Sequence, residues 1–288
     1  MHEVLIVTAS ELDDHEWCPQ YHDFRHKQRR RLIALEPEWA IHGNWAHKQL
    51  EQMIQGHPPR DLPPSMPGAT GRALVLSMHA WWERFGKVHP WDHVLMAEKP
   101  GEVNLGWLGD GVCTLERTAT SKIEVRFRGI PDGIVVWHGQ GYHLSHKTTG
   151  PSTPVDVLCQ GLAHSLHENL YPLLAREWFP DLPWGGTCAN IIRKLAEKRA
   201  IEAPEQALHI EFLPITAEGI ERARLDALDI VLRIAESRER VHRRRKGCLG
   251  IHGNSKCAYF GVCWERISID NDTLYESYNP TERYERPE

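Results

Sequence analysis

The pattern of hydrophobic and polar residues near the middle of the chain contains two β-rich runs, over residues 130–137 and again over residues 142–149. The connection between these runs, His-Gly-Gln-Gly at 138–141, contains two glycines. Two β-rich runs joined by a short glycine-containing connection are typical of a β-hairpin. The pattern therefore predicts a hairpin with a four-residue turn at its tip.

The predicted hairpin brings a carboxylate, a hydroxyl and an ammonium group together. Pairing centred on the turn places Asp132 opposite Lys147, and Ile134 opposite Ser145. Because side chains alternate between the two faces of a strand, Asp132, Ser145 and Lys147 then share one face. Such a face could hold a metal ion and steer a phosphate. It could equally be a cross-strand ion pair on a solvated sheet, which is the simpler interpretation of the hairpin alone.

Regular periods continue on both sides of the hairpin. Apolar residues that recur every three to four positions predict helices over residues 38–54, 72–85, 156–171 and 216–245. Short β-rich runs predict strands over residues 4–7, 91–98, 123–127, 187–192 and 210–215. The predicted order is helices followed by a β-meander, in which the run 123–127 leads into the hairpin.

The predicted helix 38–54 carries a polar motif on one side. Gly43, His47 and Glu51 fall at four-residue spacings, so they lie roughly on one side of the helix. Taken alone, His47 is more simply an ordinary exposed or hydrogen-bonded histidine. Glu98 ends the predicted strand 91–98, either as a further acid of a site or as an exposed strand carboxylate.

The composition restricts the possible partners. The chain has 288 residues, of which 41% are apolar and 25% charged, values ordinary for a globular protein with a real core. The formal charge of −5 argues against binding polyanions through bulk charge. A nucleic-acid surface would therefore be a local basic patch. The basic residues that could form it are Arg25, Lys27, Arg29, Arg30, Arg243, Arg244 and Arg245.

No apolar run approaches the length that spans a membrane, so we expect no membrane association. The N-terminal residues include an acidic one and only a short apolar run, unlike a signal peptide. These features predict a cytoplasmic protein in a reducing compartment. There, spaced cysteines are more often metal ligands than disulfide partners.

Three of the seven cysteines, Cys248, Cys257 and Cys263, lie within sixteen residues in a glycine-rich stretch. Such a cluster needs a fourth ligand for a zinc or an iron–sulfur site, and either Cys18 or His252 could supply it. Joining Cys18 to the cluster closes a loop of about 230 residues at a cost of about 5 kcal/mol. Metal–thiolate binding can supply about 10 kcal/mol. The remaining cysteines, Cys113, Cys159 and Cys188, have the scattered positions of core residues.

Four separated signals agree in their order along the chain. They are Ser10 with Cys18-Pro19; Gly43-x3-His47-x3-Glu51; Pro131-Asp132 followed by Lys147 and Gln160; and the three C-terminal cysteines. Together they resemble the PD-(D/E)XK nucleases of the RecB/AddB type. The branch with an iron–sulfur cluster, which includes CRISPR-adaptation nucleases and phage-encoded exonucleases, is the most similar. The resemblance covers roughly residues 4–265.

The resemblance implies a restriction-endonuclease-like α/β (α+β) core, with a mixed central β-sheet flanked by helices. It implies that His47 and Asp132 bind Mg²⁺ or Mn²⁺, with Glu98 as a further candidate. Lys147 would orient the attacking water and stabilise charge on the phosphate, and Gln160 would contact the DNA backbone or hold the site together.

The resemblance also implies a [4Fe–4S] cluster, with zinc as the alternative. Its ligands would be Cys18, Cys248, Cys257 and Cys263. The cluster would clasp residues 1–35 to residues 240–265 of a single domain that spans 1–265, with a polar tail over 266–288. Eight residues separate Cys248 from Cys257, more than in the family's commoner spacing, in which two residues separate the first two cysteines.

Position 145 departs from the family pattern, which has Asp or Glu two residues before the lysine. A serine hydroxyl is a poorer Mg²⁺ ligand than a carboxylate. Either Glu98 or another acid substitutes, or the protein is a weakened nuclease that still binds DNA, or Ser145 is an introduced substitution.

The leading expectation is a metal-dependent DNA exonuclease acting on ends or single strands, in the cytoplasm of a bacterium or a phage-infected host cell. The alternatives are a non-catalytic DNA-binding protein and a structural protein with a zinc clasp.

Overall fold

The computed structural model describes most of the chain up to residue 236 and isolated positions beyond it. The described residues are 3–32, 38–61, 68–108, 123–150, 153–236, 257, 259, 263, 268–270 and 275–277. They fall into two compact units. The central unit lies within Glu36–Gly101 and Ile130–Ala223, and the terminal unit within Met1–Leu35, Glu102–Gly129 and Arg224–Glu288.

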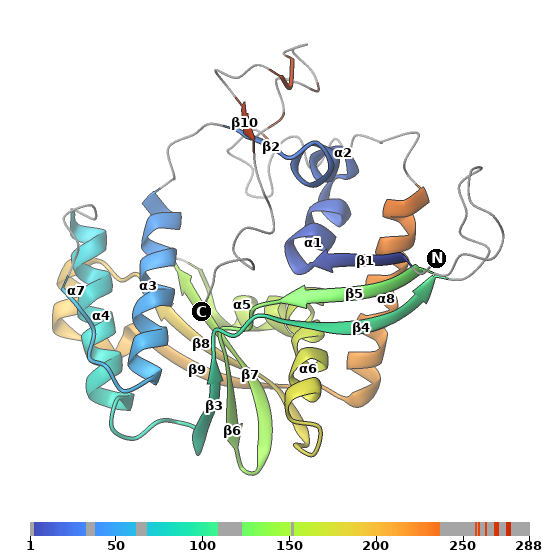
Figure 1. Ribbon diagram of the computed structural model, residues 1–288. Coiled ribbons are helices and arrows are strands. Elements are labelled where there is room, and N and C mark those ends of the chain that lie inside the picture. The colour runs from blue at the N-terminus through green and yellow to red at the C-terminus, as the bar shows by residue number, and fades with distance from the viewer. Residues whose placement is uncertain are drawn as a thin grey trace. The chain divides into compact units, whose positions relative to one another are not determined.

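The central unit is built on a five-stranded mixed sheet with the order β3-β6-β7-β8-β9 (Figure 1). Its strands are β3 (His93–Ala97), β6 (Gly133–Trp137), β7 (Gln140–Thr149), β8 (Trp184–Arg193) and β9 (Leu208–Pro214). Only β7 and β8 pair in parallel, and the other neighbours in this sheet are antiparallel. A parallel pair needs a crossover connection, which two helices between β7 and β8 provide.

Helices cover both faces of this sheet, because side chains along each strand alternate between them. The helices are α3 (Glu38–Ile54), α4 (Ala69–Phe85), α5 (Val155–Ala163), α6 (Leu166–Trp178), α7 (Glu197–Glu202) and a 3-10 turn, η2 (Pro204–Ala207). Apolar residues of α3 and α4, among them Leu50 and Trp81, pack against Leu144 and Cys188 on one face. On the other face, Cys159 of α5 packs with Ala189 and Ile191 of β8.

The β6–β7 hairpin forms as predicted, but its turn and register differ from the prediction. The connection has two residues, His138 and Gly139, and both have positive φ angles, of 49° and 73°. This matches the tight type I′ turn that suits the twist of a hairpin. Ile134 therefore pairs with His143 rather than with Ser145. A shift of two residues leaves every side chain on its original face, so Ser145 and Lys147 still face the same way.

The predicted helix 156–171 is two helices, α5 and α6. Ser165 has the extended backbone angles φ −72° and ψ 126° and serves as the N-cap residue of α6. The break is physically reasonable because serine favours the N-cap position. It places Glu168 in the first turn of α6 rather than in the middle of a longer helix.

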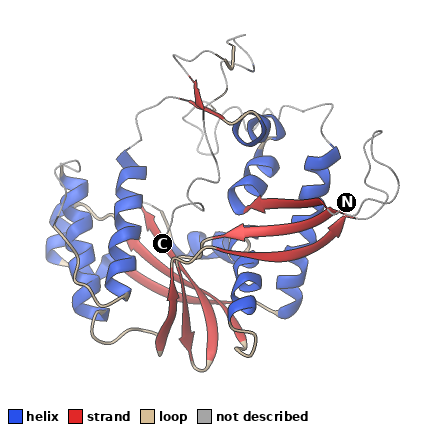
Figure 2. Cartoon of the chain, viewed as in Figure 1, coloured by secondary structure: helices blue, strands red, loops and turns tan. Residues whose placement is uncertain are grey.

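The terminal unit contains a three-stranded sheet with the order β1-β5-β4, which Figure 2 draws in red with its flanking helices in blue. Its strands are β1 (Glu3–Thr8), β5 (Ile123–Gly129) and β4 (Gly101–Leu108). β1 and β5 are parallel, and β4 runs opposite to them (Figure 1). Residues 123–127 form a strand that precedes the hairpin in sequence, as predicted. This strand, β5, does not join the sheet of the hairpin but pairs with β1 in the three-stranded sheet.

The remaining elements of the terminal unit come from both ends of the chain. They are α1 (Ala9–Trp17), α2 (Pro19–His22), the π-helical turn η1 (Asp23–Lys27), the pair β2 (Arg30–Leu32) and β10 (Tyr275–Ser277), and the part of α8 (Ala217–Glu236) from Arg224 onward. Thr8 caps α1, and its hydroxyl accepts a hydrogen bond from the Glu11 N–H at 3.3 Å. β10 lies in the stretch predicted as a tail, and its Tyr275 is buried.

The prediction of a mixed α/β protein with sheets flanked by helices is thus confirmed. No helix in the described part of the chain combines the length and the apolar composition needed to cross a membrane.

Candidate functional site

The candidate site lies in the central unit, where α3 meets the start of β6 and the middle of β7. His47 projects from α3, and its Nδ1 lies 3.4 Å from Oδ1 of Asp132. The other carboxylate oxygen of Asp132 accepts a hydrogen bond from the backbone N–H of His146 at 2.7 Å. Burial alone raises the pKa of the Asp132 carboxyl, but the hydrogen bond and charge of His47, with the charge of Lys147, bring it well below its usual range. Asp132 is therefore ionised.

Further carboxylates lie beside this pair. Glu98 follows β3, and its backbone N–H bonds to the carbonyl oxygen of Asp132 at 3.4 Å. Burial, together with the negative charges of Glu51 and Asp132, raises the pKa of Glu98 to about 7. The charges of His47 and Lys48 act in the opposite direction, so the three carboxylates are only partly compensated. Carboxylate oxygens with an imidazole nitrogen are a donor set that suits Mg²⁺ or Mn²⁺. His47, Glu98 and Asp132 therefore match such an ion in ligand type, although their ligand atoms do not all lie within 4.8 Å of one another.

The second half of the site is centred on Glu168 of α6, a residue that the sequence analysis missed. The Ser145 hydroxyl donates a hydrogen bond to Oε1 of Glu168 at 2.9 Å. Lys147 Nζ lies 3.1 Å from the same oxygen. On the other side, His143 Nδ1 lies 3.0 Å from Oε2. Glu168 is only 1% exposed, so three side chains of β7 surround a buried carboxylate.

The charges of Lys147 and Glu168 stabilise each other. Burial would raise the pKa of Glu168, but the charges of Lys147 and His143 bring it below its ordinary value. Burial would lower the pKa of Lys147, but Glu168 and Asp132 raise it above its ordinary value. Both groups are therefore ionised at neutral pH. Lys147 is a fixed cation with hydrogen-bond donors and no acceptor, suited to binding an anion.

Glu168 places a carboxylate beside Ser145, the position at which the pattern of the resembled nucleases would have an acid. The two residues are 23 positions apart in sequence, so their contact depends on how α6 packs against β7. One signal was present in the sequence. Ser165-x-x-Glu168 has the form of a capping box and marks the start of a new helix. In the structure Glu168 does not cap its helix but points toward Ser145.

A buried hydrogen-bonded chain supports the site from the α4 side. The indole N–H of Trp81 donates to Oδ1 of Asn190 at 3.1 Å. This fixes the orientation of the Asn190 amide, so its Nδ2 donates to Nδ1 of His146 at 2.9 Å. His146 then carries its proton on Nε2. Burial and the nearby charges of His47 and Lys147 lower the pKa of His146 to about 3, so this ring is neutral.

Gln160, predicted to contribute to the site, lies exposed on α5. Among the described residues, no hydrogen bond or ion pair joins its side chain to Asp132, Lys147 or Glu168. Gln160 and Glu168 belong to different helices, α5 and α6, and it is Glu168 that contacts Ser145 and Lys147.

The cysteines predicted as cluster ligands lie in the terminal unit. Cys18 is buried between α1 and α2, and Cys257 and Cys263 are half-buried. Tyr259, between the latter two, packs against Tyr21 and Phe24 with ring centroids 5.1 Å apart in each pair. The segment after Cys18 therefore contacts the segment from Cys257 to Cys263. Cys248 and His252 lie outside the described residues.

The predicted basic surface is partly engaged in internal contacts. Arg25 forms an ion pair with Asp14 at 3.0 Å. Lys27 lies 4.0 Å from Asp23 on the same helical turn. Arg29 is exposed. The side chain of Arg30 and residues Arg243, Arg244 and Arg245 fall outside the described part.

No protein-family model matches the chain, and no curated protein matches it.

Proposed function

We propose that this protein is a metal-dependent nuclease that hydrolyses phosphodiester bonds of linear or single-stranded DNA. The observation that carries the proposal is the arrangement on β7. The Lys147 ammonium group pairs with a buried carboxylate, beside the ionised Asp132 and its partner His47. A fixed cation next to clustered carboxylates is what phosphoryl transfer requires, because charge develops on the phosphate oxygens as the bond breaks.

His47, Glu98 and Asp132 would hold Mg²⁺ or Mn²⁺. When bound, such an ion supplies Lewis-acid polarisation of the phosphate and a nucleophile at neutral pH. Lys147 orients the attacking water and stabilises the developing negative charge. Glu168 keeps the lysine in place and protonated. Because Ser145 donates its hydroxyl hydrogen to Glu168, position 145 acts through that carboxylate rather than as a ligand.

The four-cysteine [4Fe–4S] cluster, with zinc as the alternative, belongs to the same proposal, as does a cytoplasmic location. The contact of Tyr21 and Phe24 with Tyr259 supports a clasp between the chain's ends. Brown protein that absorbs visible light after anaerobic purification is expected. Colourless, zinc-loaded protein from the same preparation would instead assign the cysteines to zinc.

The experiment is a cleavage assay on end-labelled linear DNA and on closed circular DNA, with Mg²⁺ or Mn²⁺. We expect the wild-type chain to degrade linear DNA, and Lys147→Ala and Glu168→Gln to reduce the rate by about a hundredfold or more. The matched control is Lys198→Ala, which removes an exposed lysine of α7. A wild-type chain that leaves both DNA forms intact with either metal would contradict the proposal.

A second candidate is a DNA-binding protein with little or no catalysis, and Ser145 is the observation that favours it. Such a protein would lower the electrophoretic mobility of labelled DNA by binding it but would release no nucleotides. The same assay therefore separates the two functions.

A further inference from the structure

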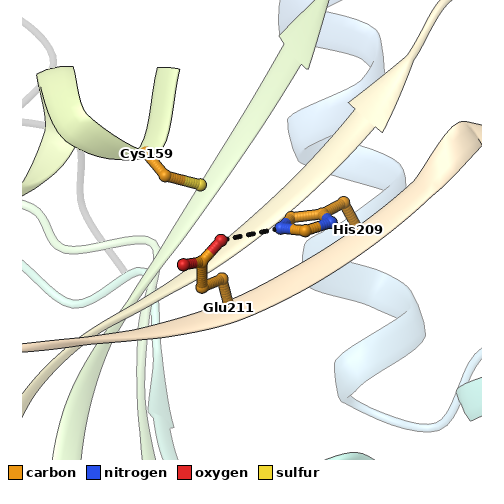
Figure 3. Close-up of side chains that lie close together, drawn as sticks. All are labelled: Cys159, His209 and Glu211. Carbon is orange, nitrogen blue, oxygen red and sulfur yellow. Dashed lines mark hydrogen bonds and ion pairs between the residues drawn. The ribbon is translucent and has the colours of Figure 1, made fainter. Parts of the chain in front are cut away.

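A second cluster of metal-binding side chain types lies in the central unit, between α5 and the edge strand β9. Cys159, His209 and Glu211 each offer one ligand atom, and these atoms all lie within 4.8 Å of one another. Among the described residues this is the only group of three or more His, Cys, Asp or Glu side chains that meets that distance. Figure 3 shows the thiol of Cys159 pointing toward the Glu211 carboxylate, which contacts the His209 ring.

The sheet register explains why the three side chains meet. His209 pairs with Ile191, and Glu211 pairs with Ala189. Being two residues apart on one strand, His209 and Glu211 point to the same face. That face is covered by α5, because Ala189 and Ile191 pack with Cys159. β9 is the last strand of the sheet, so the group lies at an edge that solvent can reach.

The exposures of the three residues differ in a way that suits a bound ion. Cys159 is 3% exposed, whereas the side chains of His209 and Glu211 are 40% and 46% exposed. His209 Nε2 lies 2.9 Å from Oε2 of Glu211. The group thus combines one buried sulfur with two partly exposed polar side chains, which is the number of protein ligands found in metal sites that keep a free position.

The group is poorly suited to be a cysteine nucleophile. Such a cysteine needs a neighbouring cation that stabilises the thiolate. Here the nearest charged group is the Glu211 carboxylate. Burial, the contact with Glu211 and the charge of Asp156 raise the pKa of the Cys159 thiol to about 12. The thiol is therefore protonated and unreactive as the chain stands.

We propose that Cys159, His209 and Glu211 form a binding site for a divalent transition metal ion of the Zn²⁺ class. One thiolate, one imidazole and one carboxylate match the ligands of zinc, whereas Mg²⁺ and Ca²⁺ select oxygen donors. On binding, the sulfur–hydrogen bond of Cys159 breaks, its proton passes to the buffer, and the sulfur's electron pair binds the metal. The site is separate from the proposed nuclease centre and does not depend on it.

The test uses Co²⁺ as a spectroscopic probe and Zn²⁺ as the competing ion, on the full chain. Metal content per chain after dialysis gives the stoichiometry, and thiolate-to-Co²⁺ absorption in the near ultraviolet reports a sulfur ligand. The variants are Cys159→Ser, His209→Ala and Glu211→Gln. The matched control is Cys188→Ala, which removes another buried cysteine of the same unit.

We expect Cys159→Ser to lose one equivalent of Co²⁺ and its thiolate band relative to the wild type and to Cys188→Ala. His209→Ala and Glu211→Gln change exposed side chains, so they test the site even if Cys159→Ser folds poorly. Each should weaken binding by about tenfold or more. Binding should also release a proton, so the affinity should rise with pH. An unchanged Co²⁺ stoichiometry and band in all three variants, or no Co²⁺ bound by the wild type, would overturn the proposal.

Discussion

The central unit contains two clusters of titratable side chains, and they differ in how their carboxylates are neutralised. Glu168 is 1% exposed and already has Lys147, Ser145 and His143 around it. Glu211 is 46% exposed at a sheet edge and shares its contacts with a histidine and a protonated thiol. A buried carboxylate with a fixed cation beside it is part of the internal framework of its site. An exposed carboxylate without one can still accept a cation from solution.

The largest expected difference between the two clusters is in stability. Glu168→Ala leaves Lys147 without its anionic partner and the buried Ser145 hydroxyl without an acceptor. We expect a loss of about 3 kcal/mol in the free energy of unfolding. Chemical denaturation measures it, with Glu177→Ala, on the exposed side of the same helix, as the control. A loss no larger than that of the control would mean that Glu168 is not held by a buried network.

The hydrogen-bonded chain behind His146 should give the next largest effect. Asn190→Ala removes the partner of both Trp81 and His146, and we expect a loss of about 2 kcal/mol. Trp81→Phe breaks only the hydrogen bond to Asn190, but it also shrinks a fully buried ring, so it too should lower the free energy of unfolding in a urea titration. If Asn190→Ala and the wild type unfold with the same free energy, the hydrogen bonds from Trp81 through Asn190 to His146 do not stabilise the site.

A buried thiol without a carboxylate beside it, Cys188, sharpens the comparison with Cys159. Burial raises the pKa of Cys188 above its ordinary value, and unfolding restores a value near 9.0. The unfolded chain therefore loses this proton at a lower pH than the folded chain, so stability falls as the pH rises through that range. Between about pH 8 and pH 10 the thiol should cost about 1.4 kcal/mol.

Thermal and urea unfolding at both pH values measure this loss. Between these two pH values, the free energy of unfolding of Cys188→Ala should fall by about 1.4 kcal/mol less than that of the wild type. An identical alkaline loss in both proteins would contradict the assignment of the titration to Cys188.

The smallest effect is expected at the edge strand. In the absence of added metal, Glu211→Gln alters an exposed carboxylate that contacts His209 and the Cys159 thiol, which should change stability by about 0.5 kcal/mol or less. Adding Zn²⁺ should then stabilise the wild type but not the variant, because a ligand that binds only the folded state raises its stability. Equal stabilisation of both proteins would place the bound ion elsewhere.

Most helices and strands could be predicted from the sequence, because their positions follow from the spacing of apolar residues close together along the chain. The helix at 38–54 matches α3 in both bounds, and the hairpin error of two residues preserved the faces of Ser145 and Lys147. What could not be read were contacts between distant segments. The parallel pairing of β1 with β5 joins residues more than a hundred positions apart.

The same limit applied to the site. Asp132 and Lys147 are recognisable from a local motif, and His47 from a helix face. Glu168 reaches Ser145 only because the chain breaks at Ser165, and Cys159 meets Glu211 only because β9 adds to the sheet edge. Sequence alone suggested a missing acid at position 145 and an ordinary core cysteine at 159.

The central claim is that Glu168 supplies the carboxylate that position 145 lacks, and moving that carboxylate tests it most directly. The cleavage rate on end-labelled linear DNA would be compared for the wild type, Glu168→Ala and the double variant Ser145→Glu/Glu168→Ala. We expect the single variant to lose about a hundredfold or more, and the double variant to recover a substantial part of that loss. A single variant as active as the wild type would contradict the account, and so would a stably folded double variant that shows no recovery.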